Sequence, residues 1–381
     1  MKTVTVIERR LTHYRVPLFE VLREQLQRQG LRMRLLHGIP TTAELKKRDE
    51  GHLPWAELLP TRYLLDGRIC IQPFQRETRT DDLIIVNHEN KLLCNLLALT
   101  VSRPRRIAFW GHGANMQSAH PDGLKERFKG WTTNRVDWWF AYTDMSVPLI
   151  ERFGFPPERI TVVNNSVDTT ELGDMWRGTP PQRLEALRRE FGLAGTDVGI
   201  FIGSLYEEKR IHFMLEAASV IKARLPTFEF VIVGAGPESG TVDRFCTQNS
   251  WAKYLGVRKG QDKAEVLALA KVMINPGLVG LGILDSFACA VPMLTTDCGL
   301  HSPEICYLEH GGNGMMTPNT LEAYAETVCN VLTNDELLQE LRRGCTSSAA
   351  NYTIQNMAAH FVTGTLGCLA AQPYVKGNRL K

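Results

Sequence analysis

The stretch NPGLVGLGILDSFACAVPMLTTDCG, residues 275–299, carries the pattern that decides the fold. It reads as the end of a buried strand, a glycine-rich loop, a helix from about Leu281 to Cys289, and a second buried strand after Pro292. Two strands joined through a helix form a βαβ unit, whose strands lie parallel in one sheet. The stretch therefore predicts a parallel sheet covered by helices.

The same alternation of short β-branched runs and amphipathic helices extends outward through the chain. In the first half, strands are predicted at residues 4–8, 31–38, 82–87, 106–113, 138–143 and 160–168. After a polar, proline- and glycine-containing stretch at 173–181, a second series is predicted at residues 199–205, 228–236, 271–277 and 291–299. We expect the α/β class, with two Rossmann-like domains at residues 1–172 and 173–353.

Length and composition agree with two globular domains. The 381 residues exceed the ~150 typical of one domain. They are 44% hydrophobic and 22% charged, which excludes disordered and fibrous proteins. The net charge of +3 is too small for a nucleic-acid-binding surface, so no nucleic acid partner is expected.

The cysteines and the hydropathy pattern indicate the cellular compartment in which the chain is expected. The nine cysteines are scattered and form no CxxC pair, which favours reduced thiols in a cytosolic protein over a disulfide framework or a zinc site. The first 15 residues lack an apolar core of signal-peptide length, and no ~18-residue apolar run occurs. A cytoplasmic location without metal or other cofactor is the expectation.

Parallel sheets of this kind bind ligands at the carboxyl ends of their strands, in two-domain proteins typically in the cleft between the domains. The segment GSLYEEKR, residues 203–210, follows a strand and opens a helix. Basic residues oppose the dipole at a helix start, and a bound phosphate would explain Lys209 and Arg210 there. Solvated first-turn side chains explain them equally well.

Two further strand ends in the second half are rich in glycine. GAGPES, residues 234–239, forms a common strand-to-helix turn through Gly234 and Gly236. At the other strand end, residues 275–282, glycines at 277, 280 and 282 are expected to leave the N–H groups of residues 278–281 free to bind a diphosphate. Asp285 falls in the first turns of the following helix, facing either that ligand or water.

In the first half, His112 lies between two glycines at the end of a strand. The flanking glycines favour exposure to a cleft, whereas a lone histidine is more often structural, so the two interpretations have about equal weight. A basic polar loop with His13, Tyr14 and Arg15 follows the first strand, and His88 belongs to the polar loop after the third. These side chains are expected at one edge of the first sheet.

Residues 275–305 resemble the signature stretch of retaining GT-B glycosyltransferases of family 4, also called group 1. ITVVNNSVDTTEL at 160–172, GSLYEEKR and FVIVGAGPES are similar to other motifs of that family, in the same order. The resemblance spans about residues 160–369. It implies a GT-B fold with sheets facing across an interdomain cleft, and a final helix, within residues 354–381, that returns to the first domain.

The resemblance also implies roles for particular residues. The second domain would hold a nucleotide-diphosphate sugar, and the first would bind a glycan or lipid-linked glycan acceptor. Lys209 and Arg210 would contact the donor diphosphate, and His112 would lie near the transferred sugar. Asp285 would contact the ribose. The remaining donor-binding positions are Gly203, Ser204, Gly234, Gly236, Gly277, Leu278, Val279, Gly280 and Leu281, and the acceptor-binding positions are His13, Tyr14, Arg15 and His88.

Four positions depart from the family pattern. Gly277 stands in place of the first glutamate of the E-x7-E motif, and Asp285 in place of the second. Ser204 and Arg210 stand where the family has arginine and glycine, so Arg210 restores a positive charge further along the loop.

These departures leave three functions open. The first is retaining transfer of a hexose in polysaccharide biosynthesis, favoured because the substituted positions keep cationic and amide donors for a diphosphate. No Asp-x-Asp element follows an apolar strand, so this transfer is expected to be metal-independent. The second is a non-catalytic partner that binds nucleotide sugar or glycan. The third is a sugar-nucleotide epimerase of the same architecture.

Basic segments in the first half offer a possible membrane contact. Residues 1–173 carry 25 basic and 20 acidic side chains. The segments are residues 9–15, 103–106 and 125–129, the last followed by Trp131. They form either solvated faces or a peripheral contact with anionic lipids at the inner membrane face.

Overall fold

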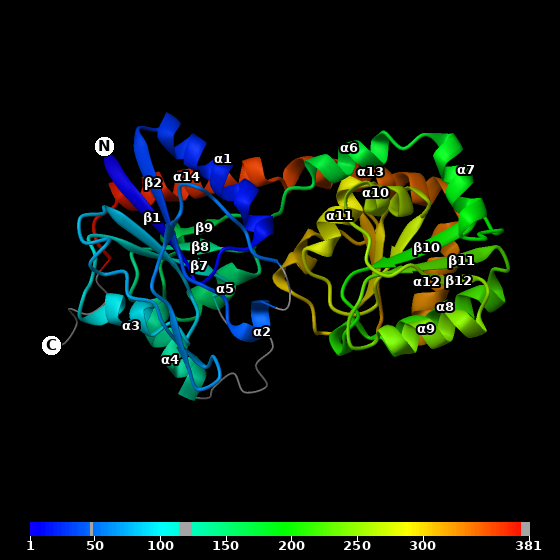
Figure 1. Cartoon of the computed structure of the whole chain (residues 1–381), viewed down its shortest axis with the longest axis horizontal. Coiled ribbons are helices and arrows are strands. Elements are labelled where there is room, and N and C mark those ends of the chain that lie inside the picture. Colours follow the sequence, from blue (N-terminus) through cyan, green and yellow to red (C-terminus); the bar gives the residue numbers. More distant parts are fainter. Residues whose placement is uncertain (46–48, 114–123, 375–381) are drawn as a thin grey trace. The chain divides into compact units, whose positions relative to one another are not determined.

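The computed structural model describes residues 1–45, 49–113 and 124–374, with the backbone alone at 124–127 and 129. The chain divides into two compact units, residues 1–168 with 353–381, and residues 169–352. Each unit is built on a parallel sheet with helices on its faces (Figure 1), so the expected α/β class is confirmed. None of the described helices is long and apolar enough to cross a bilayer.

The first unit contains a seven-stranded parallel sheet of order β3-β2-β1-β6-β7-β8-β9. Its strands are β1 (Lys2–Glu8), β2 (Leu31–His37), β3 (Glu57–Leu58), β6 (Leu83–Asn87), β7 (Ile107–Gly111), β8 (Trp138–Ala141) and β9 (Ile160–Val162). A short antiparallel pair, β4 (Arg62–Leu64) and β5 (Ile69–Ile71), lies outside this sheet. β6, β7 and β8 are buried along their whole length, which explains their continuous apolar runs.

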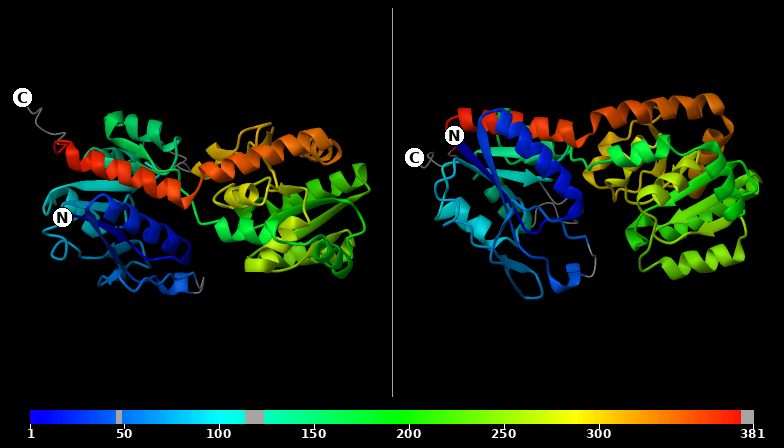
Figure 2. Two further views of the ribbon diagram at one scale, coloured as in Figure 1. Left: turned by 90° about the horizontal axis from the view of Figure 1, so that it is seen from above. Right: turned by 45° about the horizontal axis from the view of Figure 1, so that its top comes forward.

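Helices cover both faces of the first sheet. They are α1 (Val16–Arg28), α2 (Thr42–Leu45), α3 (Leu93–Thr100), α4 (Leu124–Thr133), α5 (Ser146–Glu151) and the C-terminal α14 (Ile354–Ala370). α1 and α14 pack side by side (Figure 2) on one core cluster, and α3 and α5 pack on the other. Gly364 lets α14 approach closely, because a Cβ there would lie 2.5 Å from the Phe140 ring and 2.6 Å from the Thr161 hydroxyl.

The second unit contains a six-stranded parallel sheet of order β12-β11-β10-β13-β14-β15. Its strands are β10 (Asp197–Ile202), β11 (Phe228–Val233), β12 (Ala252–Tyr254), β13 (Val272–Ile274), β14 (Met293–Thr296) and β15 (Gly314–Thr317). The helices are α6 (Thr170–Arg177), α7 (Pro181–Glu190), α8 (Ile211–Arg224), α9 (Ser239–Gln248), α10 (Gly260–Ala268), α11 (Gly282–Ala288), α12 (Leu321–Thr333) and α13 (Asp335–Asn351). The βαβ unit predicted from residues 275–299 is β13-α11-β14, and its strands are adjacent and parallel.

Strand order reverses once in each sheet. In the first sheet, β2 and β3 follow β1 along the chain and lie on one side of it. β6 lies on the other side of β1, and β7, β8 and β9 continue the sheet in that direction. In the second sheet the same reversal lies between β10 and β13. The crossover connections diverge at such a point, which leaves a crevice outside the carboxyl ends of the two central strands. Both units therefore offer a place for a ligand.

Candidate functional site

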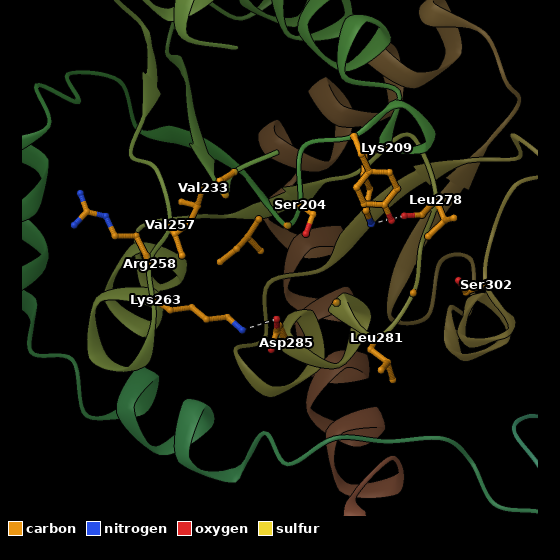
Figure 3. A pocket seen from close by; sticks show the side chains of 17 residues that line it. Ser204, Lys209, Val233, Val257, Arg258, Lys263, Leu278, Leu281, Asp285 and Ser302 are labelled. Carbon is orange, nitrogen blue, oxygen red and sulfur yellow. Dashed lines mark hydrogen bonds and ion pairs between the residues drawn. The ribbon is translucent and has the colours of Figure 1, made fainter. Parts of the chain in front are cut away.

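A cavity of about 520 Å³ lies at the strand reversal of the second sheet (Figure 3). Its size is within the ~300–1,000 Å³ usual for small-molecule sites. It is built from the segments that follow β10, β11, β12 and β13 and from α10 and α11. The lining residues are Ile202, Gly203, Ser204, Tyr206, Lys209, Val233, Gly234, Ala235, Val257, Arg258, Lys263, Leu278, Gly280, Leu281, Gly282, Asp285 and Ser302.

Glycines let the backbone after β10 and β11 pack closely at one wall. Gly234 has a φ of 144°, and a Cβ there would overlap the carbonyl oxygen of Gly203. At Gly236 a Cβ would collide with the backbone of Leu205, and Gly236 itself does not line the cavity. The turn at 234–236 thus holds the loop at 203–205 in place, whereas Gly203, Ser204 and Gly234 line the cavity.

Lys209 lies at the end of the short 3₁₀ helix Glu207–Lys209 and lines the cavity. Its ammonium group donates a 2.5 Å hydrogen bond to the carbonyl oxygen of Leu278 (Figure 3). Burial lowers the pKa of Lys209 to about 8, because the charged form is poorly solvated there. An anion bound beside Lys209 would supply the missing counter-charge.

Arg210 points elsewhere and does not line the cavity. Its φ of 55° is left-handed, and its guanidinium donates to the carbonyl oxygen of Pro276, to the Thr296 hydroxyl at 3.0 Å and to the Asn319 side-chain oxygen at 2.6 Å. The structure therefore separates Arg210 from Lys209. In this conformation Arg210 links its own loop by hydrogen bonds to the segments that contain Pro276, Thr296 and Asn319.

The amide groups of residues 278–281 are only partly available. The N–H of Leu278 donates to the Glu208 carbonyl at 2.9 Å, and the N–H of Val279 donates to His301 Nδ1 at 3.1 Å. Within the described residues, the N–H groups of Gly280, Leu281 and Gly282 have no hydrogen-bond partner. The expected set of free amides is thus corrected to residues 280–282, at the start of α11.

Gly277 does not line the cavity, because it packs against the loop that carries Lys209. A Cβ at this position would lie 2.5 Å from the Lys209 carbonyl oxygen and 2.6 Å from that of Glu208. Such distances are essentially never seen for a real Cβ, so only glycine fits here. The position that holds a glutamate in the family pattern is therefore filled, in this chain, by the backbone of residues 208–209.

Asp285 lines the cavity from α11 and forms a 2.7 Å ion pair with Lys263 of α10 (Figure 3). Lys263 was not predicted from the sequence, although a lysine in the first turn of a helix was the same signal that marked Lys209. Tyr206, Arg258 and Ser302 were not predicted either, because nothing in their spacing sets them apart. All nine cysteines are free thiols, and no group of three or more His, Cys, Asp or Glu residues in the described chain is placed to hold a metal ion.

The first unit has a smaller cavity, about 160 Å³, at its own strand reversal. Tyr14 and Arg15 line it, as does Tyr142, whose ring is in edge contact with the exposed His112 at 4.2 Å between ring centroids. The remaining two predicted acceptor residues lie outside its lining. His13 is exposed beside Tyr14, and His88 packs against Phe109 and Trp139 and bonds to Thr132.

Glu8 at the end of β1 also lines this smaller cavity, and burial raises its pKa to about 7. The folded chain then holds a proton on Glu8 that the unfolded chain releases above its ordinary pKa of 4.5. Stability from this group is complete below pH 4.5 and is lost as the pH rises to 7. We expect Glu8→Gln to remove a loss of stability of about 3 kcal/mol over this range, measured by urea unfolding at each pH. Parallel wild-type and variant profiles would contradict the shift.

Comparison with known proteins supports this architecture. The sequence model of the family "Glycosyl transferases group 1" matches residues 196–334. The alpha-monoglucosyldiacylglycerol synthase of Acholeplasma laidlawii is 23% identical over 45% of this chain and 44% of its own length. The D-inositol 3-phosphate glycosyltransferase of Thermobispora bispora is 26% identical over 54% of the chain and 49% of its own. The alignments thus span about half the length of these curated relatives.

Solved structures match over nearly the whole chain. Anabaena Alr3699/HepE, solved in complex with UDP, has a TM-score of 0.69 at 17% identity and covers 96% of this chain and 99% of its own. A glycosyltransferase from Rickettsia africae has a TM-score of 0.69 at 15% identity, covering 97% and 99%. At this identity the likeness shows the fold. The chain thus has the GT-B fold, and its residues 196–334 match the model of the glycosyl transferases group 1 family.

Proposed function

We propose that the chain transfers a hexose from a nucleoside-diphosphate sugar to a hydroxyl of a glycan or lipid-linked glycan, with retention of anomeric configuration and without a metal ion. The observation that carries this proposal is the cavity at the strand reversal of the second sheet. It combines a partly desolvated lysine with three unpaired amides, the chemistry that a diphosphate requires. The first unit would supply the acceptor side.

The cavity offers separate places for the parts of a nucleotide sugar. Lys209 and Leu278 lie on one side of the cavity, whereas Val257 and Arg258 lie on the opposite side (Figure 3). The diphosphate would lie by Lys209 and the amides of residues 280–282, and the base by Val257 and Arg258. The Asp285 carboxylate, which is ion-paired with Lys263, would accept a hydrogen bond from a ribose hydroxyl.

The chemistry follows from this placement. When the bond from the anomeric carbon to the β-phosphate oxygen breaks, negative charge develops on that phosphate, and preorganised donors stabilise it. Lys209 and the free amides would provide these donors. The acceptor oxygen would bond to the anomeric carbon from the face that the nucleotide leaves, and its proton would pass to the departing phosphate. His112, in the first unit, would orient the transferred sugar.

The similar proteins indicate which nucleotide-sugar donor to test first. Alr3699/HepE was also solved in complex with UDP-glucose, and two relatives are named as enzymes that glycosylate a lipid or an inositol phosphate. We therefore propose a UDP-sugar donor as the first to be tested. GDP-, ADP- and dTDP-sugars serve as alternatives in the same experiment.

The proposal is tested by screening these donors with cell-envelope glycan and lipid extracts and measuring the release of nucleoside diphosphate, with and without EDTA. We expect release that requires an acceptor and survives EDTA. Binding of a nucleotide sugar without release would show the non-catalytic partner instead. Change of the donor sugar without acceptor would show an epimerase, and activity lost in EDTA and restored by magnesium or manganese would overturn metal independence.

The pKa of Lys209 predicts how donor affinity depends on pH. Lys209 loses its proton near pH 8 in the free chain, and a bound diphosphate raises its pKa. Binding then takes up a proton above pH 8. Calorimetry with UDP-glucose, whose diphosphate keeps its charge over this range, should give a constant affinity from pH 6 to 7. Above pH 8 the affinity should fall by up to ~10-fold per pH unit. The Lys209→Met variant should lack this fall, and a flat wild-type profile would contradict the prediction.

We also propose a peripheral contact with anionic lipids through α3 and α4 of the first unit. Leu93, Leu97 and Val101 follow one another at a spacing of four, and Val101 is 82% exposed. On α4, Phe128 and Trp131 are exposed and stacked, at 5.7 Å between ring centroids. Arg105 follows α3 and has a 65% exposed side chain, which suits anionic headgroups although it also pairs with Asp82 at 3.1 Å. Arg103 is held by Asp137 at 3.2 Å. The basic side chains at 125, 127 and 129 lie outside the described residues.

Vesicle sedimentation tests this contact. The chain should sediment with phosphatidylcholine vesicles that contain phosphatidylglycerol and remain in solution with pure phosphatidylcholine. Val101→Ser should reduce the sedimented fraction at least twofold, whereas Leu65→Ser, at another exposed leucine, should leave it unchanged. Equal sedimentation with both vesicle types would remove the proposal.

A further inference from the structure

The free amides of residues 280–282 belong to a loop whose preceding peptide groups are held by side chains and backbone from elsewhere in the second unit. The loop, residues 277–282, connects β13 to α11. One of its partners is His301, which lies between β14 and the 3₁₀ helix Pro303–Tyr307 and does not line the cavity. A side chain behind the wall affects a ligand site through the backbone that it contacts.

His301 bonds to the backbone through both ring nitrogens. Its Nδ1 accepts a 3.1 Å hydrogen bond from the N–H of Val279, and its Nε2 lies 2.8 Å from the carbonyl oxygen of Thr296. A carbonyl oxygen can only accept and an N–H can only donate, so Nε2 carries the hydrogen and Nδ1 does not. The contacts therefore assign the neutral tautomer with its hydrogen on Nε2 to this imidazole.

The peptide group between Leu278 and Val279 connects His301 to Lys209. Its N–H donates to His301, and its carbonyl oxygen, on the opposite edge of the same trans peptide plane, accepts the hydrogen bond from the Lys209 ammonium (Figure 3). Because one plane carries both groups, the bond to His301 fixes the direction of the carbonyl that holds Lys209. A hydrogen-bonded N–H also makes the carbonyl oxygen of its peptide group a stronger acceptor.

The next peptide group carries the first free amide. The carbonyl oxygen of Val279 accepts a 2.9 Å hydrogen bond from the N–H of Ser302, the residue that follows His301 and itself lines the cavity (Figure 3). The N–H of Gly280 lies in the same trans peptide plane and points away from Ser302, so this bond fixes its direction. Two neighbouring residues thus hold two successive peptide planes of the loop.

We propose that His301 is a positioning residue of the donor site, which orients the backbone at 278–280 so that Lys209 and the Gly280 amide meet the same diphosphate. The assignment deepens the proposed function and rests on it. His301 acts through the peptide group between Leu278 and Val279 and not by contact with the donor.

The two ring nitrogens of His301 differ in how well their partners tolerate their loss. The carbonyl oxygen of Thr296 also accepts a hydrogen bond from the N–H of Cys298 at 2.9 Å, so it keeps a partner without Nε2. Val279 is fully buried, and its N–H has no second partner in the described part of the chain. A buried N–H without an acceptor is costly. The orientation of the loop therefore depends on Nδ1.

Two substitutions separate the nitrogens. Asparagine places its amide oxygen near the position of Nδ1, whereas the amide of glutamine reaches the position of Nε2. We expect His301→Gln to weaken UDP binding at least fivefold in titration calorimetry, and His301→Asn to stay within twofold of the wild type. The matched control is His310→Gln, because Nδ1 of His310 accepts the N–H of Met316 at 3.1 Å away from the cavity. It should leave the affinity for UDP unchanged.

The tautomer of His301 provides a readout that packing alone would not determine. In nitrogen NMR of the full chain labelled at histidine, the His301 ring is assigned by the signals that a folded His301 variant lacks. Nε2 should be protonated and Nδ1 unprotonated, with and without UDP. A hydrogen on Nδ1 would overturn the proposal. This measurement on the wild type keeps the test valid where thermal unfolding shows that His301→Gln does not fold.

The outcomes separate this role from the proposed function. Equal affinities of folded His301→Asn and His301→Gln, whether both are lost or both are retained, would overturn the role of Nδ1. An equal loss in His310→Gln would show a general effect of removing an imidazole from the second unit and would also overturn it. A wild-type chain that binds no nucleoside diphosphate would instead refute the proposed function.

Discussion

Replacing Lys209 with methionine is expected to weaken binding of the nucleotide-sugar donor at least 100-fold. Lys209 is the lysine that combines a cavity position with a pKa lowered by burial, so its charge is poorly solvated until an anion arrives. Charged hydrogen bonds contribute ~1.5–3 kcal/mol each, and ~2.7 kcal/mol corresponds to a factor of 100. Methionine keeps the apolar stem and so preserves the wall of the cavity. Titration calorimetry with UDP-glucose measures the change.

The matched control is Lys259→Met. Lys259 is exposed and adjoins the lining residue Arg258, so the variant removes the same charge at the rim of the same cavity. We expect less than a threefold change in affinity, because exposed charges act weakly through water. Equal losses in the two variants would show a general effect of positive charge. An unchanged affinity in folded Lys209→Met would place the diphosphate elsewhere.

Adding a single methyl group at Gly277 is expected to disrupt both the stability of the second unit and its donor site. The Cβ of Gly277→Ala would lie 2.5 Å from the Lys209 carbonyl oxygen, so the loop at 208–210 must move. Overpacking of this kind costs about 1–3 kcal/mol or more. For a unit of this size that lowers Tm by roughly 4–10 °C. Because the same loop carries Lys209, donor affinity should fall at least tenfold.

Gly277→Glu, which recreates the family residue, should be more damaging than alanine and should not increase activity. Gly240→Ala is the control, since a Cβ there has no atom within 4 Å and the residue lies in α9. It should leave Tm unchanged or slightly higher, because alanine stabilises a helix. Scanning calorimetry and donor titration measure both effects. A gain of activity in Gly277→Glu, or an unaltered Tm in Gly277→Ala, would contradict the close packing seen here.

The long strands could be predicted from the sequence, whereas several short ones could not. β1, β6, β7, β8, β10 and β11 each contain a buried, mostly apolar run of four to six residues, which is long enough for a pattern. β3 and β12 have two and three residues and lie at sheet edges. Runs of that length carry no periodicity, so pairing with a neighbouring strand defines them.

The candidate site was predicted in place but not in detail. Strand ends carried Gly203, Lys209 and Asp285 into one cavity because parallel strands end at one edge of a sheet. The roles of these residues in binding stay predictions. Arg210 could not be placed, since its direction depends on a left-handed φ and on acceptors 66 to 109 residues away.

Tertiary contacts also determined which amides are free. Glu208 and His301 occupy the N–H groups of Leu278 and Val279, and neither contact has a local sequence signal. Lys263 reaches Asp285 from a different helix. Distant partners of this kind explain why glycine spacing located the loop but not its available donors.

A crystal structure of the chain grown with UDP would show where the diphosphate binds. We expect a β-phosphate oxygen within hydrogen-bonding distance of the Lys209 ammonium and of at least one amide among residues 280–282. A nucleotide bound outside the crevice at the end of β10 and β13, or a diphosphate held without Lys209, would contradict it.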